Sequence, residues 1–265
     1  MSDLVLSLFP GIGLLDRAFE LEGFCVVRGP DPLWGGDVRR FHPPAGRFDG
    51  VIGGPPCQAF SRMRYLNPSA GQKHGNLIPE FERVALEASP RWFLMENVSE
   101  APEPDVPGFH VRSLIFNNRW TGAEQHRVRR FSFGTPTGLT LHPDVALFEA
   151  PLMCQAVTSD SRAVPVKMVR DGNGGHKPKS VFMVRPPTVT TEPGPVQRSQ
   201  GARYTVADMC RLQGLPETFG DELPFSSDDK RKVIGNGVPI PMGRAIARAV
   251  RRALGLPIIS LDVAL

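Results

Sequence analysis

Residues 53–61, GGPPCQAFS, follow a short apolar run, FDGVI (48–52). The apolar run is typical of a buried strand, so the stretch after it is expected to form a loop at a strand's carboxyl end, where open α/β sheets bind ligands. Its two glycines permit a sharp turn, while Pro55 and Pro56 restrict φ and stiffen the backbone before Cys57. An isolated cysteine is more often a small buried apolar residue. This setting instead predicts a rigidly presented thiol in a functional loop.

The composition favours a globular protein with many loops. The chain has 265 residues, of which 41% are hydrophobic, and contains 27 glycines and 27 prolines. This length suits one mid-sized domain, or one domain with a small appendage. No apolar run approaches the length of a membrane span and the N-terminus lacks the basic start of a signal peptide, so we expect a cytoplasmic protein. The net charge of +4 suits a polyanionic partner but is common among proteins of other kinds.

The four cysteines lie far apart and form no CxxC pair. This spacing argues against a disulfide framework and against a zinc site, so no metal is expected. Cys57 is therefore expected to be a free thiol.

The N-terminal part is typical of a strand, a helix and a second strand. Residues 3–9, DLVLSLF, form an apolar run; 10–23, PGIGLLDRAFELEG, combine a glycine turn with helical periodicity; and FCVVR (24–28) predicts the next strand. Glycines at the start of a helix leave room and free N–H groups for a nucleotide cofactor. The pattern alone is weak, and Asp16 stands where dinucleotide-binding sites have a third glycine, which argues against NAD.

Two later strands carry ionisable side chains. RWFLMENV (91–98) is an apolar run that delivers Glu96 to a strand end, and a partly buried carboxyl group there is a candidate proton donor. QHRVRRFSFG (125–134) predicts another strand, whose alternation places three polar residues on one side: Gln125, Arg127 and Arg129. Arginines on a buried side need an anionic partner, such as Glu96 or a phosphate group. The alternative is an exposed strand face.

Helical periodicity predicts three further helices, at 76–88, 205–214 and 241–254, the second with a capping box at its start. The stretch that begins at residue 232 and ends in GNGVP, just before the last of these helices, is predicted as a loop. Residues 62–75 are polar and basic with nothing to bury, so they suit a mobile lid over a substrate.

Residues 99–108 cannot form a helix because they contain Pro102, Pro104 and Pro107. Without a helix there, we expect part of one sheet face near 110–117 to be exposed. An exposed apolar face invites either a second copy of the chain or coverage by the tail 256–265.

The stretch from about 135 to 200 loses helical periodicity and contains short strand candidates. VPVKMVR (164–170) and SVFMVR (180–185) flank a tip rich in glycine, asparagine and lysine, which predicts a hairpin able to enter a groove.

Six short motifs, in this order, resemble those of the DNA (cytosine-5-)-methyltransferases: FPGIG (9–13), GGDV (35–38), PPCQ (55–58), ENV (96–98), QHRVR (125–129) and GNGVP (235–239). The resemblance implies an α/β fold with a Rossmann-like class I methyltransferase core, whose mixed, mostly parallel sheet has helices on both faces, and a small, mainly β target-recognition domain. The implied domains are a catalytic one at 1–137 and 232–265, a target-recognition one at 138–204 and a connecting hinge helix at 205–231.

The resemblance also implies the reaction, a methyl transfer from S-adenosylmethionine to carbon 5 of a cytosine flipped out of duplex DNA. In it Cys57 bonds covalently to cytosine C6, Glu96 contacts N3, and Arg129, with Arg127 beside it, stabilises charge near O2. The implied cofactor-binding residues are Phe9, Gly11, Ile12, Gly13, Asp31, Asp37, Val38, Pro56, Leu77, Asn236 and Val238. The expected DNA-binding residues are Gln58, Ser61, Arg62, Arg64, Lys73, Lys177 and Lys179.

The chain departs from the family's pattern at the cofactor loops. Leu14 replaces the last glycine of the first motif, and Arg28, followed by Gly29 and Pro30, stands where the family has an acid for the ribose hydroxyls. Asp31 is the nearest acid, so we expect it to accept the ribose hydrogen bonds and Arg28 to face solvent or DNA.

Three alternatives remain at this point. A tRNA cytosine-5 methyltransferase would share the motifs, and a catalytically weakened DNA-binding or regulatory homologue would account for the departures, although Cys57, Glu96 and Arg129 are all present. An NAD oxidoreductase would need the missing third glycine. The expected protein is bacterial or phage-encoded, cytoplasmic, and a monomer or weak dimer that binds double-stranded DNA and no membrane.

Overall fold

A computed structural model describes residues 3–56, 75–146, 168–170, 176–178 and 204–259. Its centre is a sheet with the strand order β2-β1-β3-β4-β6-β5. The strands are β1 (Leu4–Leu8), β2 (Cys25–Arg28), β3 (Gly50–Gly53), β4 (Trp92–Asn97), β5 (His110–Asn117) and β6 (Val128–Thr135). The pairs from β2 to β4 are parallel, whereas β6 runs antiparallel to both β4 and β5. The predicted mixed, mostly parallel α/β fold is confirmed.

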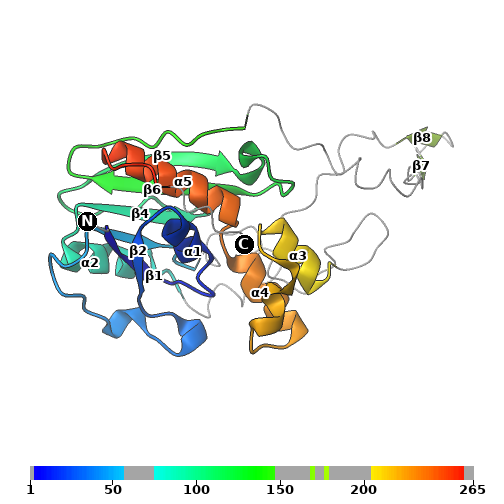
Figure 1. The fold of residues 1–265 in the computed structure, drawn as a ribbon, viewed down its shortest axis with the longest axis horizontal. Coiled ribbons are helices and arrows are strands. Elements are labelled where there is room, and N and C mark those ends of the chain that lie inside the picture. The colour runs from blue at the N-terminus through cyan, green and yellow to red at the C-terminus, as the bar shows by residue number, and fades with distance from the viewer. Residues whose placement is uncertain (1–2, 57–74, 147–167, 171–175, 179–203, 260–265) are drawn as a thin grey trace.

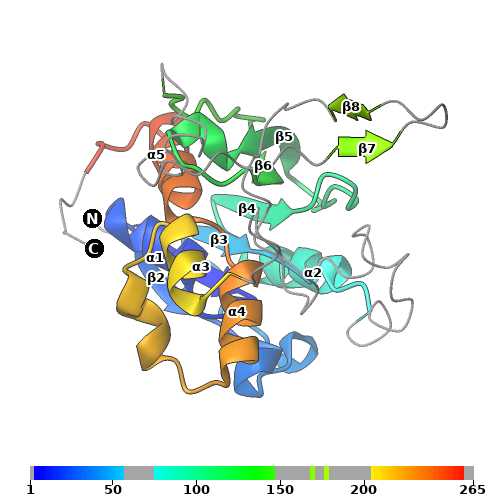
Figure 2. The same ribbon diagram turned by 90° about the vertical axis from the view of Figure 1, so that its right-hand side faces the viewer.

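Helices cover both faces of this sheet (Figures 1 and 2). Helices α1 (Leu14–Leu21) and α5 (Ile240–Ala253) lie on one face, and α2 (Ile78–Ala88) lies on the other. Small residues bring α1 and α5 close together, because a Cβ atom on Gly243 would stand 2.6 Å from the Cβ of Ala18. Each face has its own buried apolar cluster, which explains why the central strands read as continuous apolar runs.

The proline-rich segment covers the sheet without forming a helix. Ala101 and Val106 are buried in the cluster on the α2 side, and the ring of Phe109 lies 5.2 Å from that of Phe93. Arg130 fixes this segment by donating to the carbonyl groups of residues 99, 101 and 102. The segment therefore covers part of this face, while Ile115 of β5 is 51% exposed, in line with the expectation of partial exposure near 110–117. The tail's residue Ile259 packs beside Gly23, next to β2 and not on β5.

The last third of the described chain packs against α1. Helices α3 (Val206–Leu212) and α4 (Ser227–Asn236), with the 3-10 helix η7 (Glu217–Glu222) between them, contribute to a cluster that contains Leu14 and Leu21. The capping box at the start of α3 is confirmed. The loop predicted from residue 232 was wrong in its first part, because 232–236 form the end of α4. This helix is mostly polar, so apolar periodicity gave no signal for it.

A short hairpin is present in the middle of the chain. Strand β7 (Met168–Arg170) pairs antiparallel with β8 (His176–Pro178), and Lys177 lies in β8 opposite Val169. The hairpin was predicted, but its return strand begins earlier than SVFMVR, whose residues lie outside those described. The division into domains stays a prediction. Among the described residues, no helix is long and apolar enough to span a membrane.

Candidate active site

The topology places a ligand site at the carboxyl ends of β1 and β3. These two strands are neighbours, but the helix after β1 lies on one face of the sheet and the helix after β3 lies on the other (Figure 1). The loops after the two strands therefore diverge, and open α/β sheets bind ligands at such a point. The loops concerned are Phe9–Gly13 and the one that begins at Gly54 and leads to Cys57.

The first loop is a tight turn built on positive φ angles. Gly11 and Gly13 have φ angles of +56° and +77°, and Phe9, which is not a glycine, has +56°. Left-handed backbone at a non-glycine residue is strained and is often found where a ligand binds. A Cβ atom on Gly11 would have no neighbour within 4 Å, so the space over this residue is open. The turn can thus accept a ligand against its backbone.

Asp31 ties the loop after β2 to this turn. One oxygen of its carboxylate accepts a hydrogen bond from the backbone N–H of Gly11 at 2.8 Å, and the other accepts from the N–H of Leu33 at 2.7 Å. Trp34 adds a second tie, since its indole N–H donates to the carbonyl of Gly11 at 2.7 Å. Asp31 therefore lies beside the glycine turn, as its expected role requires, and each carboxylate oxygen retains a second lone pair.

The Arg28 side chain is 55% exposed, in line with the expectation that it faces solvent or DNA, but its guanidinium group also lies against the glycine turn. Its Nε atom lies 3.0 Å from a carboxylate oxygen of Asp16, whose side chain is fully buried. Asp16 also accepts a hydrogen bond from the hydroxyl group of Ser7. Burial raises the pKa of Asp16 to about 6, against the lowering effects of Ser7 and Arg28. No local sequence pattern predicts the contact between Arg28 and Asp16.

Glu96 and Arg129 form the second part of the site. Arg129 Nε lies 2.9 Å from Glu96 Oε1, and both side chains are largely buried. The other carboxylate oxygen, Oε2, faces the loop after β3, because a Cβ on Gly54 would stand 3.0 Å from it. Asn97 donates from its side chain to the carbonyl of Pro55 at 3.1 Å. The backbone that leads to Cys57 therefore runs beside Glu96.

Arg127 has a different partner, although it belongs to the same motif. Its guanidinium group donates to the carbonyls of Gly235 at 2.9 Å and Asn236 at 3.2 Å, and only 1% of the residue is exposed. Strand β6 begins after it, at Val128. Arg127 thus fixes the end of α4.

The other expected cofactor residues lie around the same edge. Phe9, Val38 and Leu77 are buried together in the cluster on the α2 side. Asp37 accepts from the N–H of Arg39 and caps the 3-10 helix η2 (Val38–Arg40). Val238 is buried in the cluster on the α5 side, whereas Asn236, Ile12 and Pro56 are at least partly exposed.

Several expected residues lie outside the described part of the chain: Cys57, Gln58, Ser61, Arg62, Arg64, Lys73 and Lys179. Sequence reasoning missed Trp34, which is 55% exposed beside the glycine turn and whose ring centroid lies 5.6 Å from that of Phe225. Trp34 could have been noticed in the sequence because it is a large aromatic residue in a loop of glycines and prolines.

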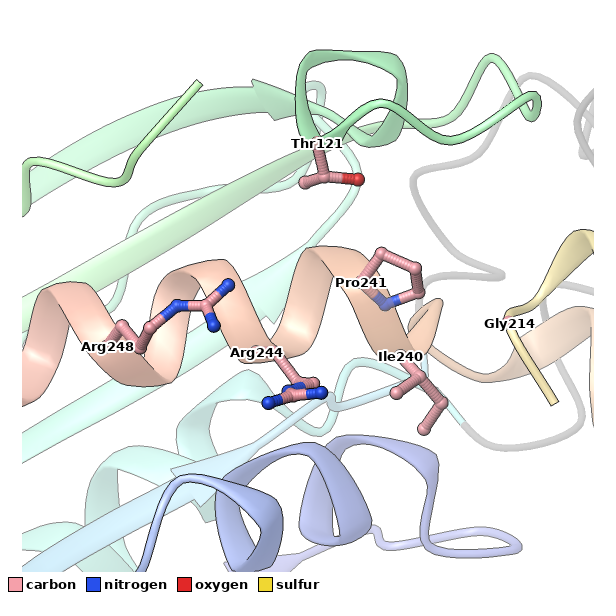
Figure 3. Close-up of a pocket in the computed structure, with 6 residues that line it drawn as sticks. All are labelled: Thr121, Gly214, Ile240, Pro241, Arg244 and Arg248. Atoms are coloured by element: carbon pink, nitrogen blue, oxygen red, sulfur yellow. The ribbon is translucent and has the colours of Figure 1, made fainter. Parts of the chain in front are cut away.

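One cavity of about 200 Å³ lies apart from these residues (Figure 3). It is lined by Thr121, Gly214, Ile240, Pro241, Arg244 and Arg248. Both arginines are held by the buried carboxylate of Glu22, at 2.6 Å and 3.2 Å, which ties α5 to the end of α1. None of the residues expected to bind cofactor or DNA lines this cavity. The ion pairs with Glu22 give the two arginines a structural role.

Comparison with known proteins agrees with this arrangement. The profile of the family described as C-5 cytosine-specific DNA methylase matches residues 35–181 and 154–252. The chain is 24% identical to the Type II methyltransferase M.NgoPII of Neisseria gonorrhoeae over 94% of its own length and 96% of that protein's. It is 25% identical to M.FnuDI of Fusobacterium nucleatum, over 94% of each chain.

Among solved structures, a protein described as a DNA modification methyltransferase encoded within a prophage (E. coli) superimposes with a TM-score of 0.64 at 20% identity, covering 96% of this chain and 100% of the other. The Entamoeba histolytica methyltransferase EhMeth gives a TM-score of 0.62 at 12% identity, covering 96% and 99%. These two likenesses concern the fold. Since the family profile matches well over half of its residues, the chain belongs to the C-5 cytosine-specific DNA methylase family.

Proposed function

We propose that this protein transfers a methyl group from S-adenosylmethionine to carbon 5 of a cytosine in duplex DNA, through a covalent bond between Cys57 and cytosine C6. The observation that carries the proposal is the Glu96–Arg129 pair, which is buried beside the backbone of Gly54 and Pro55 just before Cys57. The named relatives are bacterial Type II methyltransferases, which supports duplex DNA as the substrate and a bacterial cytoplasm as the location.

The chemistry begins with a ring carbon that is not nucleophilic by itself. The Cys57 thiolate adds to C6, and the electron pair of the C5–C6 bond moves into the ring toward N3 and O2. Glu96 donates its carboxyl proton in a hydrogen bond to N3, which stabilises the added negative charge, and Arg129 holds the Glu96 carboxyl group in place. Carbon 5 then becomes nucleophilic and can accept a methyl group. Loss of the C5 proton to a base restores the double bond and releases the thiolate of Cys57.

The residues at the glycine turn fit S-adenosylmethionine, which when bound supplies the electrophilic methyl group. The open space over Gly11 and the N-terminus of α1 accommodate a polar ligand against the backbone. Asp31 accepts hydrogen bonds from the ribose hydroxyls with its remaining lone pairs. Phe9, Val38 and Leu77 provide the apolar wall beside the adenine, and the loop after Cys57 and the β7–β8 hairpin contact the DNA.

The proposal can be tested without knowing the target sequence. A long DNA duplex synthesised with 5-fluorodeoxycytidine contains every short site, and fluorine blocks the loss of the C5 substituent. Incubation with the protein and S-adenosylmethionine is expected to give a covalent adduct that survives denaturing electrophoresis. The same incubation with 5-fluorocytosine tRNA serves as the comparison, because adducts on tRNA and none on DNA would favour the RNA methyltransferase. Absence of both adducts would contradict the covalent mechanism.

A further inference from the structure

The position of Arg28 distinguishes the glycine turn of this chain from the family's pattern, which has an acid at the end of β2. Arg28 is the last residue of β2, and its guanidinium group folds back across the glycine turn. Three of its guanidinium atoms would lie 2.6, 2.7 and 3.2 Å from a Cβ atom on Gly13. A side chain at residue 13 would displace the Arg28 guanidinium group from this position, and the φ of +77° also favours glycine there.

One edge of the guanidinium group is anchored and the rest is open. Asp16 holds Nε at 3.0 Å, and the Asp16 side chain is fully buried while that of Arg28 is 55% exposed. The buried carboxylate fixes where the cation lies. Asp16 is in turn held by Ser7 at the end of β1. Among the described residues, no acceptor other than Asp16 contacts the Arg28 guanidinium group, so its terminal nitrogens remain available to a ligand.

Two favourable electrostatic features meet at Gly13. This glycine is the N-cap of α1, a helix of eight residues. The N–H groups of the first turn of a helix have no partner within the helix, and in α1 they point toward the glycine turn. The Arg28 guanidinium adds a full positive charge at the same place. A guanidinium group donates hydrogen bonds and accepts none, and its fork of N–H groups matches a carboxylate. The turn therefore offers a carboxylate site at Gly13.

The opposite chemistry lies at the other end of the turn. Asp31 is bonded to the N–H of Gly11, and the Cα atoms of Gly11 and Gly13 are at most about 7 Å apart, so the Asp31 acceptor oxygens and the Arg28 donors lie at opposite ends of one short turn. A ligand with hydroxyl groups at one end and a carboxylate several bonds away would satisfy both. S-adenosylmethionine has its ribose hydroxyls and its methionine carboxylate in this relation.

We infer that Arg28 binds the carboxylate of S-adenosylmethionine and of its product S-adenosylhomocysteine, and that Asp16 holds Arg28 in position for this contact. The inference rests on the proposed function. Where the family has an acid for the ribose hydroxyls, this chain has Arg28 at the end of β2, and this cation binds another part of the same cofactor.

The test uses two ligands that differ in the amino-acid group. S-adenosylhomocysteine carries the carboxylate, whereas 5′-methylthioadenosine keeps the adenosine and the sulfur and lacks it. Calorimetry with the wild-type chain and Arg28→Ala is expected to show a loss of affinity of roughly tenfold or more for S-adenosylhomocysteine. Affinity for 5′-methylthioadenosine should stay unchanged. Arg91→Ala, an exposed arginine just before β4, is the matched control and should affect neither ligand.

Removal of Arg28 leaves Asp16 buried without a cation, so a second comparison guards against misfolding. Asp16→Asn and the double variant Asp16→Asn/Arg28→Ala contain no unpaired buried carboxylate, and the double variant should bind S-adenosylhomocysteine more weakly than the single one. An equal loss for both ligands, or no loss for either, would overturn the inference. A wild-type protein that binds neither ligand would instead overturn the proposed cofactor, and this inference with it.

Discussion

The two halves of the proposed site differ in how closely they keep the family's pattern. At the catalytic half, Glu96 and Arg129 contact each other directly and lie next to the Gly54–Pro55 backbone, as their motifs imply. At the cofactor half, an arginine replaces the acid at the end of β2, and two aspartates take up new partners. Bond formation at one carbon needs particular groups at particular positions, whereas cofactor affinity is a sum of contacts that can be redistributed. The predictions below test this contrast.

The largest effect is expected at Cys57. Cys57→Ser should reduce methyl transfer to at most about a thousandth of the wild-type rate, because a hydroxyl group is a far weaker nucleophile than a thiolate at neutral pH. DNA binding, measured by gel shift at a fixed salt concentration, should survive, since serine fills the same space. Cys25→Ser changes an exposed cysteine in β2 and is the control. A Cys57→Ser protein that methylates at the wild-type rate would exclude the covalent step.

Substitutions of the two arginines of the QHRVR motif should have different effects, one mainly on the rate and the other on stability. Arg129→Ala removes the partner of Glu96, so the kcat of the folded protein should fall by about 10²–10³-fold, in addition to the loss of stability from the unpaired Glu96 side chain. Arg127→Ala removes the donor to the Gly235 and Asn236 carbonyls, so the free energy of unfolding should fall by roughly 2–4 kcal/mol. Denaturant titration and single-turnover kinetics on both variants separate the two effects. If both arginines changed only the rate, the structural role assigned to Arg127 would be wrong.

Substitutions of Asp31 test the cofactor half of the site directly. Asp31→Ala should weaken S-adenosylmethionine binding about tenfold, a loss of about 1.4 kcal/mol, while leaving affinity for DNA unchanged. Asp31→Asn keeps an acceptor for the N–H of Leu33 and loses one carboxylate oxygen, so its effect should be intermediate. A cofactor affinity that is indifferent to both changes would mean that another group holds the ribose.

The smallest effect concerns the stability cost of Asp16. Burial raises its pKa from 3.8 to about 6, so between these values the native protein keeps a proton that the unfolded chain has lost. The native state then binds more protons, and the contribution of Asp16 to stability is present below pH 4 and is lost as pH rises to about 6. Asp16→Asn should remove this part of the pH dependence. Identical stability profiles for the variant and the wild type between pH 4 and 6 would contradict it.

Much of the architecture could be predicted from the sequence because it depends on local patterns. The six sheet strands, α1, α2, α3 and α5 all follow from apolar periodicity, and the cap of α3 follows from Thr205 and Asp208. The positions of Glu96 and of the loop before Cys57 follow from where apolar strands end. Helix α4 could have been found from its N-cap, since the hydroxyl of Ser226 accepts from the N–H of Asp229, but not from apolar residues.

Only the tertiary structure decided which charged groups meet. Arg127 reaches carbonyls more than a hundred residues away, Arg130 fastens the proline-rich segment, and Arg28 turns back over Gly13 to a buried aspartate. A long, flexible arginine side chain can reach many partners, and its choice depends on which acceptors folding leaves buried and unpaired. Local patterns fix the direction of the backbone, while the pairing of buried charges depends on contacts between segments far apart in the chain.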